Sequence, residues 1–131
     1  MKVDQIIETC LYAEDLDAVE RFYHRVLGLV PFSRVKDRHV FFRCKNSVFL
    51  VFNPTKTAVT GGDVPPHGAQ GSGHVAFGMR REDISAWRDR LRQHGVPIET
   101  EITWPSGGHS LYFRDPAGNS VELTMPQTWN L

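Results

Sequence analysis

The chain has 131 residues, of which 40% are hydrophobic and 23% charged, a composition typical of a folded globular domain rather than a disordered or fibrous protein. The 15 basic residues balance the 15 acidic ones, without a long run of one sign, so neither nucleic acid nor a membrane is an expected partner. Two cysteines without a CxxC pair exclude a disulfide scaffold, and the lack of a long apolar segment or signal-peptide pattern predicts a cytoplasmic protein.

The first half of the chain predicts a βαβββ order. A strand is expected over residues 6–13, followed by a helix that Asp15 caps and whose apolar residues recur at helical spacing. Gly28 and Pro31 end this helix, because glycine accepts a left-handed backbone and proline cannot continue a helix. Three strands should follow, over residues 29–35, 39–44 and 47–53.

The second half repeats this order. A strand is expected over residues 74–79, and Asp83 is the predicted cap of a helix that ends at Gly95, shortly before Pro97. These two residues lie 67 and 66 positions after Gly28 and Pro31, which indicates an internal duplication. Three strands again follow, over residues 98–104, 110–114 and 120–125.

We therefore predict an α+β fold of two tandem βαβββ modules within a single domain of residues 1–131. Module one covers about residues 1–55 and module two about residues 74–127. Residues 54–73 are rich in Gly, Pro and Thr and are predicted to form a flexible linker. A connection of this length is either a functional lid or a plain spacer between the modules, and the sequence leaves both open.

The duplication relates three residues that can bind a metal ion. An offset of 66 carries Glu8 in the first strand onto His74 in the corresponding strand, and Leu50 corresponds roughly to Glu122 in the last strands. Because strand side chains alternate between faces, Glu8, His74 and Glu122 should all point away from the helix-packed face. The sequence thus predicts a metal site formed by Glu8, His74 and Glu122.

Glu122 carries much of this prediction, because a carboxylate within a Val-Leu-Met strand is costly to bury without a partner. A salt bridge to an arginine is the alternative interpretation. One imidazole and two carboxylates suit Mn²⁺, Fe²⁺, Ni²⁺ or Zn²⁺. Three protein ligands would leave positions open on the metal, as in catalytic rather than structural sites.

Further pocket residues follow from the last hairpin. If its strands pair symmetrically about Ala117, Tyr112 lies opposite Glu122 and could donate a hydrogen bond or proton to a bound oxyanion, although an ordinary cross-strand aromatic is as compatible with the pattern. Trp104 lies in a glycine-rich loop and is a candidate for closing over an apolar substrate. His109 is a candidate acid or base, and the remaining histidines except His74 are expected on the surface.

Three motifs together resemble the vicinal oxygen chelate superfamily, which includes glyoxalase I, fosfomycin-modifying enzymes, bleomycin-resistance proteins and extradiol dioxygenases. They are the segment 15–29, Gly73-His74-Val75-Ala76-Phe77, and the stretch from Tyr112 to Leu123 with its Asp-Pro-Ala-Gly-Asn turn. The resemblance implies a cup-shaped, partly closed mixed sheet with helices outside, and metal positions at Glu8, Leu50, His74 and Glu122. It also implies a homodimer whose sites are completed across the subunit interface.

The chain departs from the pattern of this superfamily at two of these positions. Members commonly carry His or Gln where this chain has Glu8, and glyoxalase I has a carboxylate where this chain has Leu50, which argues against glyoxalase I activity. We therefore expect a metal-dependent enzyme that acts on a small oxygen-bearing organic substrate by lyase, addition or dioxygenase chemistry. The alternative is a metal-free protein that binds an antibiotic, as in the bleomycin-resistance branch.

Overall fold

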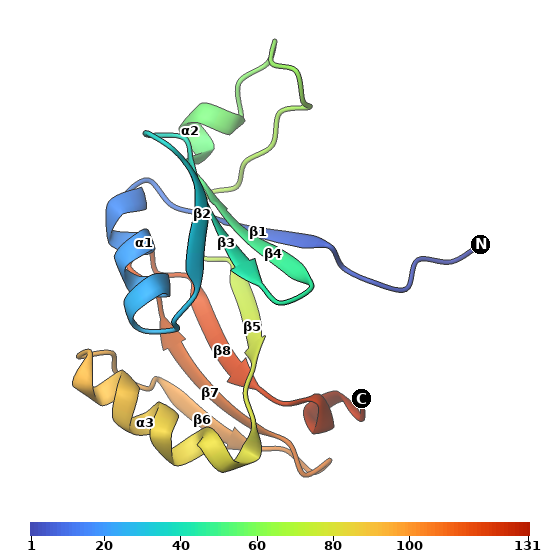
Figure 1. Cartoon of the computed structure of the whole chain (residues 1–131), viewed down its shortest axis with the longest axis vertical. Coiled ribbons are helices and arrows are strands. Elements are labelled where there is room, and N and C mark those ends of the chain that lie inside the picture. The colour runs from blue at the N-terminus through green and yellow to red at the C-terminus, as the bar shows by residue number, and fades with distance from the viewer. The chain divides into compact units, whose positions relative to one another are not determined.

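The computed structural model describes residues 1–131, which divide into two compact units, 1–71 and 72–131. Each unit contains one four-stranded mixed sheet, and each follows the predicted βαβββ order (Figure 1). Unit 1 contains β1 Glu8–Tyr12, α1 Leu16–Arg25, β2 Val30–Val35, β3 His39–Cys44, β4 Ser47–Phe52 and α2 Pro54–Thr57. Unit 2 contains β5 His74–Gly78, η1 Arg81–Asp83, α3 Ile84–Gln93, β6 Thr100–Thr103, β7 His109–Arg114, β8 Ser120–Thr124 and η2 Pro126–Trp129.

The first helix forms as predicted. The Asp15 side chain accepts a hydrogen bond from the backbone N–H of Ala18 at 2.9 Å and so satisfies one of the unpaired donors of the first turn. Gly28 has φ of 72°, the left-handed conformation that ends the helix at little steric cost. The buried face of α1 packs on the sheet of unit 1, where the Tyr23 ring contacts Phe42 and Phe49. Each such buried side chain contributes about 1.5–3 kcal/mol of hydrophobic stabilisation.

The start of the second helix differs from the prediction. Asp83 occupies the N-cap position of α3, but its side chain makes no capping hydrogen bond. Its carboxylate instead accepts hydrogen bonds from Arg80 at 2.7 and 3.1 Å, which removes it from the helix end. The 3₁₀ turn η1, Arg81–Asp83, precedes the helix and supplies a backbone entry in place of the side-chain cap.

Residues 54–73 include a short helix and specific polar contacts. They begin with α2, which Asn53 caps by accepting a hydrogen bond from the backbone N–H of Thr55 at 3.1 Å. Further along, His67 donates its backbone N–H to the carbonyl of Thr57, and its ring nitrogen lies 2.8 Å from the Tyr12 hydroxyl. This segment is therefore held against unit 1 by specific contacts.

One histidine was wrongly expected on the surface. His39 is only 7% exposed and stacks on Phe41 with ring centroids 3.9 Å apart. Burial, and to a smaller extent the neighbouring Arg38 guanidinium, lower the pKa of His39. His67 is partly buried, with its ring against Phe52.

The sheet register confirms the internal duplication. In unit 1, β1 runs parallel to β4 and pairs Glu8 with Val48 and Cys10 with Leu50. In unit 2, β5 runs parallel to β8 and pairs His74 with Ser120 and Ala76 with Glu122. Glu8 and His74 thus occupy equivalent positions, as do Leu50 and Glu122. None of the helices is both long and apolar enough to cross a membrane.

Candidate metal centre

His74 and Glu122 lie side by side on the sheet of unit 2. They belong to the neighbouring parallel strands β5 and β8, and His74 Nε2 lies 3.3 Å from Glu122 Oε2. Glu122 is 5% exposed, whereas the His74 side chain is 52% exposed. The pair therefore combines a buried carboxylate with an imidazole that solvent can reach.

A backbone contact determines which ring nitrogen of His74 carries the hydrogen. His74 Nδ1 lies 3.1 Å from the carbonyl oxygen of Ser120. A carbonyl can only accept, so Nδ1 carries a hydrogen and the neutral ring presents the lone pair of Nε2 to Glu122. Carbonyl hydrogen bonds of this kind orient metal-binding histidines in known sites.

Two lone pairs that face each other at 3.3 Å repel unless a proton or a cation lies between them. Donors that share a metal at bond lengths of about 2.0–2.2 Å lie roughly 3.0–3.4 Å apart for ligand angles between octahedral and tetrahedral values. The observed separation fits this range. A second proton on His74, which would form an ion pair, also satisfies the contact.

No arginine or lysine pairs with Glu122, so the arginine salt bridge considered from the sequence does not form. The carboxylate instead accepts a hydrogen bond on Oε1 from the Ser110 hydroxyl at 2.5 Å. Tyr112 pairs with Glu122 in the register of β7 and β8, which confirms its predicted placement. Burial and a hydrogen bond to Glu122 raise the pKa of Tyr112, with a smaller opposing effect from Ser110. The Tyr112 hydroxyl therefore keeps its proton beside the carboxylate.

Glu8 begins β1 in unit 1 and is exposed. The structure contains no group of three or more His, Cys, Asp or Glu side chains that could hold a metal ion. It brings together His74 and Glu122 of the predicted ligand set, and the role of Glu8 stays a prediction. Leu50, at the position equivalent to Glu122, is buried and cannot bind a metal.

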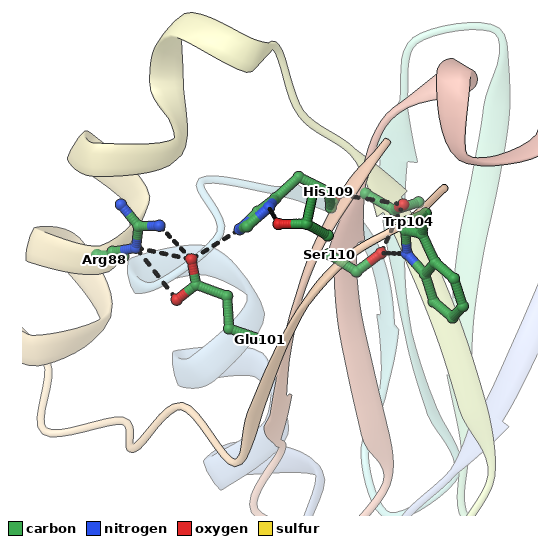
Figure 2. A network of polar contacts seen from close by, with 7 residues as sticks. Arg88, Glu101, Trp104, His109 and Ser110 are labelled. Carbon is green, nitrogen blue, oxygen red and sulfur yellow. Dashed lines mark hydrogen bonds and ion pairs between the residues drawn. The ribbon is translucent and has the colours of Figure 1, made fainter. Parts of the chain in front are cut away.

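The other two predicted pocket residues lie on opposite faces of β7, as Figure 2 shows. His109 shares its face with α3, and its Nε2 lies 2.7 Å from Glu101, which also pairs with Arg88 of that helix. The side chain of Trp104 lies on the other side of the strand and donates its indole N–H to Ser110 at 2.8 Å. The Ser110 hydroxyl in turn donates to Glu122. The structure therefore places Trp104 near Glu122, and it places His109 in an ion-pair network with the helix.

The loop between Trp104 and His109 is packed against the end of the chain. A Cβ added to Gly108 would lie 2.5 Å from the backbone N and Cα of Thr128. We expect Gly108→Ala to lower the free energy of unfolding by about 1–3 kcal/mol, because the backbone of η2 must move. Thermal unfolding measures this effect. Gly62→Ala, where the nearest atom is 3.9 Å away, is the control, and an equal change in both variants would contradict the prediction.

Comparison with known proteins settles the family. A model described as the Glyoxalase/Bleomycin resistance protein/Dioxygenase superfamily matches residues 3–123. The chain belongs to this superfamily. The solved structure of a lactoylglutathione lyase from Agrobacterium tumefaciens covers 100% of both chains with a TM-score of 0.95 and 37% identity.

Two curated proteins are also similar to this chain. The glutathione transferase FosA of Serratia marcescens is 32% identical over 114 residues, which are 86% of this chain and 74% of that protein. The metallothiol transferase FosB of Bacillus licheniformis is 29% identical over 111 residues, which are 83% of this chain and 67% of that protein.

Reasoning from the sequence missed one contact at this glyoxalase-superfamily site. Ser110 is fully buried and forms the 2.5 Å hydrogen bond to Glu122. Strand alternation could have found it, because Ser110 lies two residues before Tyr112 and therefore on the same face. A serine within a strand does not, however, by itself indicate that its hydroxyl contacts a carboxylate.

Proposed function

We propose that this protein is a metal-dependent enzyme that adds a thiol to a small oxygen-bearing electrophile such as an epoxide. The observation that carries the proposal is the contact between His74 Nε2 and the buried Glu122 Oε2, which no arginine or lysine neutralises. His74 and Glu122 are the proposed metal ligands, with Glu8 as the third. The metal is a divalent ion of the Mn²⁺, Fe²⁺, Ni²⁺ or Zn²⁺ type, given this mixture of nitrogen and oxygen donors.

The names of the similar proteins favour thiol chemistry. FosA is a glutathione transferase, FosB a metallothiol transferase, and the Agrobacterium structure is a lyase named for a glutathione adduct. Each name refers to a thiol, and that of FosB also refers to a metal. Of the lyase, addition and dioxygenase reactions expected from the sequence, addition is therefore the one that we propose.

Leu50 argues for addition over a glyoxalase-type lyase reaction. Moving a proton between two carbons requires a base near the substrate, and the position equivalent to Glu122 offers only a buried aliphatic side chain. Opening an epoxide with a thiol needs no such base on carbon. The addition breaks the S–H bond of the thiol and a C–O bond of the epoxide, and it forms a C–S bond and an alkoxide. The proton that the thiol releases to solvent balances the one that the alkoxide takes up.

The proposed roles follow from the chemistry of each group. A bound divalent metal would polarise the oxygen of the electrophile as a Lewis acid. The Tyr112 hydroxyl, which keeps its proton because the pKa is raised, is the proposed donor to the alkoxide. Trp104 is the proposed contact to the apolar part of the substrate. His109, held by Glu101 and Thr103, is the weaker candidate for an acid or base.

Metal analysis and a conjugation assay test the proposal. Protein purified without chelators should contain about one metal ion per site and should join glutathione to fosfomycin or another epoxide, detected by mass spectrometry. His74→Ala should weaken metal binding at least about 100-fold and abolish conjugation, because it removes a direct ligand. Glu99→Gln, which changes an exposed carboxylate paired with Arg114, is the control.

Three outcomes would overturn this function. Oxygen consumption with catechols, without thiol addition, would replace it by dioxygenase chemistry. Ligand-induced thermal shifts that chelators leave unchanged would favour the metal-free binding protein. Equal metal contents in the parent and in His74→Ala would remove the site itself. Light scattering of the purified protein tests the expected homodimer.

A further inference from the structure

The hydroxyl groups beside Glu122 form a continuous chain. The Ser110 hydroxyl donates to Glu122 Oε1 at 2.5 Å and lies 2.9 Å from the Thr124 hydroxyl. Thr124 in turn lies 2.9 Å from the hydroxyl of Thr128 in η2. The indole N–H of Trp104 reaches the same Ser110 oxygen at 2.8 Å (Figure 2). Four side chains thus converge on one carboxylate oxygen, directly or through Ser110.

The number of protons fixes the direction of this chain. A serine hydroxyl has one proton and two lone pairs, and the proton of Ser110 is used on Glu122. Trp104 can only donate, and it occupies one lone pair of Ser110. Thr124 must therefore donate to the other lone pair and accept from Thr128. Its 3.5 Å contact to the carbonyl of His109 is the longer alternative for its proton.

This arrangement distinguishes the two oxygens of Glu122. Oε1 is held by a short, charge-assisted hydrogen bond, whereas Oε2 faces His74 Nε2. We propose that Ser110, Thr124, Thr128 and Trp104 form a hydrogen-bond relay that positions Glu122 to present Oε2 alone as a one-oxygen metal ligand. This inference rests on the proposed function, in which Glu122 binds the metal. The four residues are positioning residues and not catalytic residues.

The relay also connects the carboxylate to the end of the chain. Thr128 lies in η2. Its carbonyl accepts a hydrogen bond at 3.3 Å from the hydroxyl of Ser106, which lies in the loop after Trp104. Gly108 leaves no room for a side chain next to Thr128. The loop and the C-terminal turn therefore hold the outer members of the relay in place.

Substitutions at Thr124 separate hydrogen bonding from packing. Thr124→Val keeps the shape and removes the hydroxyl, whereas Thr124→Ser keeps the hydroxyl. Ser110→Ala removes the direct donor to Glu122. We expect Ser110→Ala to weaken Co²⁺ binding about 10- to 100-fold, as for other partners of metal ligands. Thr124→Val should show a smaller loss, and Thr124→Ser should bind Co²⁺ as the parent does.

Two measurements read out the relay without an activity assay. Isothermal titration with Co²⁺ gives the affinity, and the visible Co²⁺ spectrum should weaken in Ser110→Ala when Glu122 binds through both oxygens and raises the coordination number. In the metal-free protein, the indole N–H resonance of Trp104, identified by its loss in Trp104→Phe, should move in Ser110→Ala and in Thr124→Val. It should stay in place in Thr124→Ser.

The two measurements also separate this inference from the proposed function. If the parent binds no Co²⁺ through His74, the proposed function and the ligand role of Glu122 fail together, and the indole resonance still decides whether the relay exists. If the parent binds Co²⁺ and Ser110→Ala retains its affinity and spectrum, the positioning role is overturned. The positioning role would also be overturned if the Trp104 indole resonance had the same position in the parent, Ser110→Ala and Thr124→Val. Thermal unfolding confirms that each variant is folded.

Discussion

Glu122→Gln is expected to abolish metal binding and, in the same variant, to raise the thermal stability of the metal-free protein. The amide oxygen can still accept the hydrogen bond of Ser110, and the amide N–H₂ can donate to the lone pair of His74 Nε2. With a neutral His74 in the metal-free protein, a repulsive contact between two acceptors thereby becomes a hydrogen bond, and a buried charge disappears. We expect a gain on the order of 1 kcal/mol, or about 4 °C in Tm.

The sign of the change in Tm distinguishes a neutral His74 from an ion pair in the metal-free protein. If His74 were doubly protonated in the free protein, Glu122→Gln would remove an attraction and lower the Tm. Differential scanning calorimetry in the presence of a chelator measures the sign, and titration with Mn²⁺ measures the expected loss of affinity. Glu99→Gln again serves as the control, because its carboxylate is exposed and lies outside the site. A lower Tm with unchanged Mn²⁺ affinity would contradict the metal centre.

Asn119→Ala should give the largest loss of stability among the polar substitutions in unit 2, about 2–4 kcal/mol. Asn119 is almost fully buried, and its Oδ1 accepts the backbone N–H of Gly73 at 2.8 Å. Its Nδ2 donates to the buried Asp115 carboxylate at 3.0 Å. The substitution removes both hydrogen bonds, and it loosens the backbone that leads directly into His74.

Denaturant unfolding measures the stability of Asn119→Ala, and metal titration measures the displacement of His74. Metal affinity should fall as well, because Gly73 no longer holds the start of β5 beside Ser120. Ser72→Ala is the matched control, since it removes an exposed hydrogen bond to the carbonyl of Gly118 in the same turn. A loss for Asn119→Ala no larger than for this control would show that the turn does not depend on Asn119.

The fold was predictable from the sequence because its signals are local. Asp15 and Gly28 mark the first helix by capping chemistry and by backbone conformation, and both act as expected. The prediction failed at Asp83, where a neighbouring arginine competes for the carboxylate. It also failed at His39, whose ring stacks on Phe41 of its own strand and contacts Phe52, its partner on the neighbouring strand β4. The contact with Phe52 depends on which strands are neighbours and leaves no periodic trace in the sequence.

The candidate site was predictable to the extent that it follows the repeat. The offset between the modules placed His74 beside the strand of Glu122, and hairpin symmetry placed Tyr112 opposite Glu122. Neither argument reaches Ser110 and Thr124, because their role depends on hydroxyl orientation within a buried strand pair. The position of His109 on the face opposite Tyr112 could have been anticipated by counting along the strand. The two residues are an odd number of positions apart, and an odd separation reverses the side-chain direction.

The equivalent positions of Leu50 and Glu122 differ in chemistry, because one copy of the repeat has a buried aliphatic side chain where the other has a buried carboxylate. Around Leu50, the strand neighbours are Cys10 and Phe41. Introducing an acid there would place a charge among apolar side chains, so transplanting the missing glyoxalase ligand requires rebuilding its surroundings as well. If Glu122 binds the proposed metal ion, that capacity belongs to its whole neighbourhood, and the exchange of a single residue would not transfer it from one half of the repeat to the other.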